Sequence, residues 1–321
     1  MKNSPPIIGH ASQIAELQSN IETGNVAHAY LFSGPKSIGK MTVARWFARE
    51  LLLLGAEATH ADTIRQIDCL VHPDLLVLDQ LWIEGVLEDW HVLGKSSNIP
   101  QEHRSKAPKA RTDTISIDDI RVIHDRLHET GTGRYSCCII RSVERMQEPA
   151  ANALLKMLEE PPEGRVFLLT TEQRSSLLPT VVSRTRVLPF FPVSLAVLRP
   201  LLQGIPSEDH QFCLHVAQGA PGVLHRLRVE KSALQEQRLL RTQAFSFFSA
   251  RPSERQKILE NFAERKQELR FLLLHMALAL RELRPPAFLR WSHALPSFVQ
   301  YLDAHVNYAL AVQQFVLTDS Q

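Results

Sequence analysis

The chain has 321 residues, with 36 Lys and Arg against 34 Asp and Glu, 44% hydrophobic residues and 22% charged residues. This length predicts two or three folded units. The composition is that of a soluble protein with a full core, which excludes a disordered chain and a strongly basic nucleic-acid coat. The 4 cysteines are too scattered for a disulfide framework, and neither a membrane span nor a signal peptide is visible, so we expect a cytoplasmic protein.

Short apolar runs alternate with helical patterns through residue 190. Each run is nearly continuous rather than alternating, which is typical of parallel strands covered on both faces and joined by crossover helices. The pattern therefore predicts an α/β domain with a five-stranded parallel sheet. The expected strands are residues 29–33, 75–79, 136–141, 165–171 and 185–190.

Helices are expected between these strands. One covers residues 39–53, and a second begins at Ser116, where Asp119 three positions later predicts a capping box. A third has a proline in its first turn and ends before Pro161. Residues 80–114 interrupt the rhythm and are expected to form a long surface loop.

No strand is expected after Pro192, and the remaining sequence shows helical periodicity. We therefore predict that the α/β domain, with its phosphate loop, covers residues 1–192. A small helical lid is expected over 193–230 and an all-α collar over 231–321. Amphipathic helices over 256–280 and 297–317 are expected to pack in the collar.

The strongest local signal is a phosphate-loop pattern between the first strand and the following helix. Glycine lets backbone amides turn toward a phosphate, the helix N-terminus adds positive potential, and the lysine amine reaches the terminal phosphates. The alternative is a glycine turn that only connects the strand to the helix. The candidate nucleotide-binding residues are Gly34, Lys36, Ser37, Ile38, Gly39, Lys40, Met41 and Thr42.

Two parts of a working ATPase site are missing from this pattern. Met41 stands where a hydroxyl normally binds Mg²⁺, and a thioether is a poor ligand for a hard cation. The third strand ends in Arg141 and Ser142 instead of an acidic pair, and we expect the nearby Glu144 to act locally. The sequence therefore predicts no metal site and no hydrolysis at this loop, although ATP could still bind.

An ordered series of segments resembles the delta-prime subunits of bacterial DNA polymerase III clamp loaders, within the AAA+ superfamily. The resemblance is good from about residue 7 to 192, and its most specific part is the run Asn152–Pro162. The other segments that carry it are Ile7–His10, His28–Gly34, the phosphate loop, His72–Asp74 and Ser183–Arg184.

The resemblance implies a role for Arg184 as an arginine finger that acts in trans on a neighbouring subunit's ATP. Taken alone, Arg184 would be expected to pair with a local carboxylate on the surface. The resemblance also implies two sensor positions. Thr170 or Thr171 stands at the first, and Gly222 stands at the second, where active relatives carry an arginine. Many relatives have a four-cysteine zinc module, whereas this chain has only Cys69 in that region, and Cys69 with His72 does not complete a site.

The resemblance implies a non-catalytic clamp-loader subunit that helps to place a sliding clamp on primed DNA, with ATPase subunits of the gamma or tau type, a delta-type subunit and the clamp as partners. One alternative is an ATP-hydrolysing subunit or a motor resembling a branch-migration helicase. A DNA-binding module is a third reading, since Lys106, Lys109 and Arg111 are basic. Without interleaved aromatic residues, a solvated loop explains those charges better.

Overall fold

A computed structural model describes the chain as two compact units. The first unit contains residues up to Leu198 together with Gly219–Gly222, and the second contains Arg199–Gln218 and everything from Val223 onward. The predicted division into three domains stays a prediction. The residues described are 7–54, 60–69, 72–78, 114–128, 133–285, 287–304 and 306–318, so Lys106, Lys109 and Arg111 lie outside them.

The first unit contains a five-stranded sheet with the order β2-β3-β4-β1-β5, and every neighbouring pair is parallel. The central strands are buried, as their apolar sequences require. The expected α/β fold is confirmed, with strand ends shifted by a residue or so. The strands are β1 (Ala29–Ser33), β2 (Leu75–Leu78), β3 (Ser136–Ile140), β4 (Arg165–Thr171) and β5 (Arg186–Pro189).

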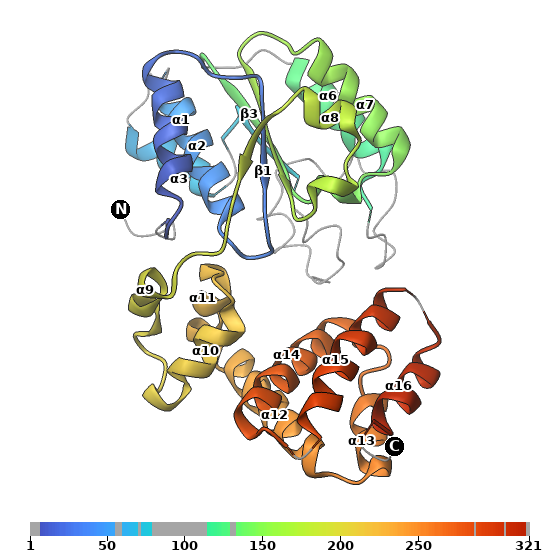
Figure 1. Cartoon of the computed structure of the whole chain (residues 1–321). Helices are drawn as coiled ribbons and strands as arrows, with labels where there is room; N and C mark the ends of the chain where they lie inside the picture. The colour runs from blue at the N-terminus through green and yellow to red at the C-terminus, as the bar shows by residue number, and fades with distance from the viewer. Residues whose placement is uncertain are drawn as a thin grey trace. The chain divides into compact units, whose positions relative to one another are not determined.

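Helices cover both faces of this sheet. Figure 1 shows α1, α2 and α3 on one side and α6, α7 and α8 on the other. The helices α2, α6 and α7 were predicted, whereas α1, α3 and α8 were not. Their bounds are α1 (Ala11–Glu22), α2 (Lys40–Leu53), α3 (His60–Asp68), α6 (Ile117–His128), α7 (Glu148–Glu159), α8 (Pro179–Ser183) and α9 (Leu195–Leu198).

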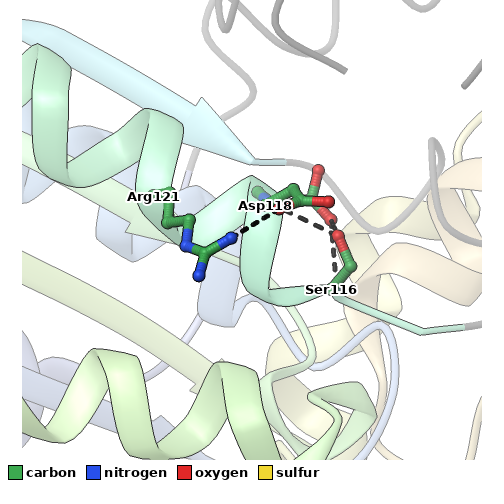
Figure 2. Close-up of polar contacts among 4 residues, drawn as sticks. Ser116, Asp118 and Arg121 are labelled. Carbon is green, nitrogen blue, oxygen red and sulfur yellow. Dashed lines mark hydrogen bonds and ion pairs between the residues drawn. The ribbon is translucent and has the colours of Figure 1, made fainter. Parts of the chain in front are cut away.

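The predicted capping box starts α6. Ser116 donates its backbone amide and its hydroxyl to Asp119 Oδ2, at 2.9 and 2.8 Å, and its Oγ accepts from the amide of Asp119 at 3.4 Å (Figure 2). One turn later Arg121 pairs with Asp118 at 3.1 Å. These contacts satisfy amides that a helix start leaves without partners, and they orient the apolar face of α6 toward the core. That face contributes Ile120, Ile123 and Leu127 to the main cluster under the sheet.

Register brings three strand ends together at one edge of the sheet. Ser33 of β1 lies beside Thr171 of β4, and Ile140 of β3 lies beside Leu169 of β4. Ligands of parallel α/β sheets bind outside the carboxyl ends of the strands. The segments that leave β1, β3 and β4 are therefore the ones that build the candidate site.

The second unit is helical, and no strand follows Pro189 among the residues described. Its helices contribute to an aromatic core that includes Phe247, Trp291, Phe298 and Phe315. No helix in the described part of the chain is long and apolar enough to cross a membrane. The helices are α10 (His210–Ala217), α11 (Pro221–Val229, whose first residues belong to the first unit), α12 (Lys231–Ser249), α13 (Pro252–Glu260), α14 (Lys266–Leu283), α15 (Phe288–Asp303) and α16 (Tyr308–Val316).

Two helices predicted as continuous are each broken, so the predictions over 256–280 and 297–317 were wrong. The first breaks after Glu260, where a turn buries Phe262 in the aromatic core. The second breaks before Asn307, whose side chain accepts from the amides of Ala309 and Leu310 and begins α16. The apolar spacing continues through both turns, so it predicted continuous helices. The N-cap residue Asn307 is a local signal for a new helix start that the prediction missed.

Candidate functional site

The phosphate loop occupies the position that its sequence predicts, between the last residue of β1 and the first residue of α2. Ser37 and Gly39 have positive φ angles of 58° and 115°. A Cβ on Gly34 would lie 2.4 Å from the carbonyl oxygen of Phe190, so only glycine fits there. The loop is therefore shaped by close backbone packing as well as by its turn.

Lys40 turns its ammonium group into the loop itself. Its Nζ donates to the carbonyl oxygens of Gly34 and Pro35 at 2.5 and 2.7 Å. Burial lowers the pKa of Lys40 to about 8, although the carboxylates of Glu172 and Glu144 oppose the change. A phosphate would have to replace these carbonyls as the partner of the lysine.

Backbone amides in the loop are available to an anion. Among the residues described, the amides of Ser37, Ile38 and Gly39 make no hydrogen bond. Amides at such a turn, followed by a helix N-terminus, are the groups that bind phosphate in phosphate loops. ATP binding by Gly34, Lys36 and the rest of the loop remains a prediction.

Cys69 and His72 were predicted not to complete a metal site. No group of three His, Cys, Asp or Glu side chains that could hold a metal ion occurs within the described ranges. Cys69 is exposed, and His72 Nδ1 accepts the amide of Asp74 at 3.1 Å, which gives the imidazole a local role. At the position of the usual hydroxyl, Met41 offers only a thioether, which is a poor donor for a hard cation.

The segment after β3 binds the end of β4. Ser142 has a positive φ of 54° and donates its amide to Thr170 Oγ1 at 3.2 Å. Glu144 Oε1 accepts the amide of Glu172 at 3.2 Å, while Glu144 Oε2 is buried and has no hydrogen-bond partner within the described segments. Glu144 thus bridges two strand ends, close enough to Lys40 to influence its pKa.

The two threonines considered as sensors also secure the loop to the sheet. The carbonyl oxygen of Thr171 accepts the amide of Gly34 at 3.1 Å, and its Oγ1 accepts the amide of Gln173 at 3.2 Å. Both threonines are buried. Their polar groups hold β1, β3 and β4 in register at the site.

Arg184 lies at the C-terminal end of α8, and none of its contacts among the described residues involves the phosphate loop. Its guanidinium pairs with Glu159 Oε1 of α7 at 2.8 Å and donates to the carbonyl oxygen of Thr180 at 3.1 Å. The side chain is 36% exposed. This is the local pairing expected of a surface arginine, and it leaves the group accessible to another molecule.

Sequence reasoning missed two residues at this site, His10 and Glu172. His10 Nε2 lies 2.8 Å from the carbonyl oxygen of Ile38, and the amide of Glu172 fixes Glu144. Neither residue belongs to the loop pattern. His10 is the last residue of the segment Ile7–His10 that carries the resemblance, so that segment was an available signal, but no role at the site was predicted for His10.

Comparison with known proteins gives one family and several relatives. The family model described as DNA polymerase III, delta subunit, matches residues 9–194. The delta' subunit of Bacillus subtilis is 30% identical over 181 residues, which are 55% of this chain and 46% of that protein. The delta' subunit of Pseudomonas aeruginosa is 30% identical over 210 residues, which are 63% of this chain and 56% of that protein.

Relatives with another name match equally well. The gamma/tau subunit of Mycobacterium tuberculosis is 29% identical over 223 residues, or 66% of this chain, and the match spans about a third (34%) of that longer protein. A solved structure from Thermotoga maritima, described as a gamma subunit-related protein, has 19% identity and a TM-score of 0.44, with 94% of this chain and 97% of the other covered.

Proposed function

The chain belongs to the DNA polymerase III delta subunit family of clamp-loader proteins, and from that membership we propose that it is a delta-prime-type subunit without ATPase activity of its own. It takes part in the ATP-dependent loading of a sliding clamp on primed DNA. Its partners are ATPase subunits of the gamma or tau type, a delta-type subunit and the clamp, with DNA reached through the complex. The compartment is the cytoplasm.

The observation that carries this proposal is Arg141 at the end of β3. A carboxylate there would hold Mg²⁺ and orient the attacking water in a working site. A guanidinium instead repels a divalent cation, and Arg141 lowers the pKa of Lys40, which places its charge within electrostatic range of the loop. With Met41 in place of a hydroxyl, the loop lacks both ligands, so any ATP bound there stays intact.

The catalytic contribution of the subunit is assigned to Arg184. A half-exposed guanidinium can exchange its surface carboxylate, Glu159, for the γ-phosphate of a neighbouring subunit at little cost, because exposed pairs contribute about 0–1 kcal/mol. Arginine also has five N–H donors, more than its three local partners, Glu159, Thr180 and Ser183, use. The ion pair therefore holds the side chain ready without sequestering it.

The test is reconstitution with gamma or tau, delta and the clamp. Arg184→Ala should lower hydrolysis at the neighbouring site by about 10³-fold or more, the lower range for an arginine finger, while the complex still assembles on gel filtration. Arg174→Ala, which removes another exposed arginine of the same unit, serves as the matched control. Equal DNA-stimulated hydrolysis in the two variants would reject the role of Arg184.

An ATP-hydrolysing subunit is the second candidate, and the unbonded loop amides with Lys40 are the observation in its favour. The similarity to gamma/tau proteins points the same way. Purified chain alone separates the two functions. Mg²⁺-dependent hydrolysis that disappears in Lys40→Ala would establish the second candidate, whereas ATP binding without turnover agrees with the first.

A further inference from the structure

The tip of the phosphate loop is joined to a segment far along the chain. The carbonyl oxygen of Ser37 accepts the backbone amide of Gly222 at 3.0 Å. Gly222 lies in the first turn of α11, where the amides have no partner inside the helix. Residues Gly219–Gly222 cluster with the sheet in the first unit, so this bond lies within that unit.

Glycine is required on the α11 side of the contact. A Cβ on Gly222 would lie 2.8 Å from the Ser37 carbonyl oxygen and 3.1 Å from Ser37 Cβ. Gly219 has a φ of +83°, and its Cβ would lie 2.5 Å from Pro192 Cβ. The carbonyl oxygen of Gly219 also accepts the amide of Val193 at 2.8 Å. The segment is thus held at both ends by backbone hydrogen bonds.

A second element supports the loop from the N-terminal side. The ring of His10 lies with its centroid 4.7 Å from that of Phe190, and its Nε2 is 2.8 Å from the carbonyl oxygen of Ile38. The two neighbouring carbonyls at the loop tip, of Ser37 and Ile38, therefore have partners from the α11 segment and from the N-terminal segment. Lys40 satisfies the carbonyls of Gly34 and Pro35.

We propose that the phosphate loop is a clasp that fixes residues 219–222 to the sheet unit through the Ser37–Gly222 hydrogen bond, with no nucleotide required. The carbonyls of Gly34, Pro35, Ser37 and Ile38 have protein partners. In the described part of the chain, the amides of Ser37, Ile38 and Gly39, which would bind an anion, make no hydrogen bond. A phosphate would bind the N–H groups of the loop, whereas Gly222 binds the C=O group of Ser37, so the two interactions do not compete for the same atoms. Nucleotide binding therefore leaves the clasp closed, and the clasp persists whether or not the chain acts in a clamp loader.

Amide hydrogen exchange on the full chain tests the clasp. Without nucleotide, peptides covering residues 219–229 should be protected, and adding ATP with Mg²⁺ should change their exchange less than about twofold. Gly222→Ala should speed exchange there by about tenfold, the upper end for one backbone hydrogen bond. Gly133→Ala is the matched control, because a Cβ at Gly133 meets its neighbours only at 3.7 Å and beyond. Protection that appears only with ATP, or equal exchange in the two variants, overturns the proposal.

The wild-type chain gives a second measurement that does not depend on the alanine variant folding. Its amide exchange over residues 219–229 is compared with and without ATP, and protection that is already full without nucleotide supports the clasp, whereas protection that ATP must supply contradicts it.

Discussion

Two buried cations, one in each unit, are held by backbone carbonyls in different ways. Lys40 donates to two carbonyls of its own loop, and its pKa falls to about 8. Arg255 donates to the carbonyls of Phe247 and Phe248 at 2.9 and 3.2 Å and approaches that of Val316 at 3.5 Å. The lysine folds back on one short segment, whereas the arginine joins the ends of α12 and α16.

The difference separates a site from a structural support. A lysine ammonium is a compact group that can lose its proton or exchange carbonyls for phosphate. The guanidinium of Arg255 lies 4.9 Å from the centre of the Trp291 ring and fits the negative ends of two helices with a fixed fork of donors. In the phosphate loop, the buried lysine has partners that a phosphate can replace. In the helical core, the buried arginine has partners from two helices and holds those helices together.

The largest effect is expected from breaking the arginine support. Arg255→Met should lower the free energy of unfolding of the second unit by about 3–5 kcal/mol, because buried carbonyls that lose a donor cost about 1–3 kcal/mol each. Urea-dependent amide exchange in α12 and α16 measures it. Arg281→Met, at an exposed arginine of α14, should stay within about 0.5 kcal/mol of wild type. Similar losses in both variants would show that Arg255 does not hold the helix ends.

A third buried base, His275, sharpens the comparison because its partner is a side-chain amide and not a backbone carbonyl. Its Nε2 lies 3.0 Å from Gln237 Oε1 and its ring lies near Phe212, while its Nδ1 has no hydrogen-bond partner among the residues described. Burial, with Arg241 adding to it, lowers the pKa of His275 from 6.5 to about 4. The imidazole of His275 is therefore neutral in the folded protein at neutral pH.

Acid should destabilise the second unit through His275. Between pH 6.5 and 4 the unfolded chain binds a proton that the folded chain does not, so stability is full above pH 6.5 and falls as the pH drops toward 4. At about 1.4 kcal/mol per pKa unit, the loss approaches about 3 kcal/mol. Unfolding free energies at pH 7 and 4.5 should show it in wild type and largely not in His275→Gln. An equal acid loss in the variant would assign the effect to other groups.

Lys40 should show a dependence of the same sign, with stability rising as the pH rises, but at alkaline pH and with a smaller size. Between pH 8 and 10.5 the unfolded chain keeps a proton that folded Lys40 has lost, so the contribution of Lys40 to stability rises with pH. We expect wild type to gain about 2 kcal/mol relative to Lys40→Met over this range, with about 1.4 kcal/mol for each pKa unit as the upper limit. Bound ATP should raise the pKa of Lys40 and remove the gain. Parallel pH profiles for wild type and variant would refute it.

The contrast between the units also explains what could be read from the sequence. Strands such as β3 were predictable because continuous apolar runs report burial directly, and the capping box at Ser116 is a local pattern. The helix α8 has 5 residues, too few for a period to show. The contact of Gly222 with Ser37 joins residues far apart in the chain, and no spacing rule encodes it. The phosphate loop could be predicted because its residues are consecutive in the sequence. The residues that support it, His10 and Glu172, come from other segments of the chain.

Among the single substitutions, the smallest effect is expected at Asn307, where α16 begins. Asn307 Oδ1 accepts the amides of Ala309 and Leu310 at 3.0 and 3.4 Å, so Asn307→Ala should lower the stability of the second unit by about 1 kcal/mol. Ser116→Ala removes a comparable cap from α6 and should leave exchange in α16 unchanged. That control separates loss of a particular cap from a general effect of alanine.

Combining Arg255→Met with Asn307→Ala decides whether Arg255, which lies on α13, supports α16 as a unit. Arg255 reaches the carbonyl of Val316 at the last residue of α16, and Asn307 begins the same helix. If α16 docks all at once, a helix already released by Arg255→Met gains little from its cap. The double variant should then lose less than the sum of the single losses, by about 0.5 kcal/mol or more. Additive losses would mean that the two ends of α16 are held independently and that the arginine acts on α12 alone.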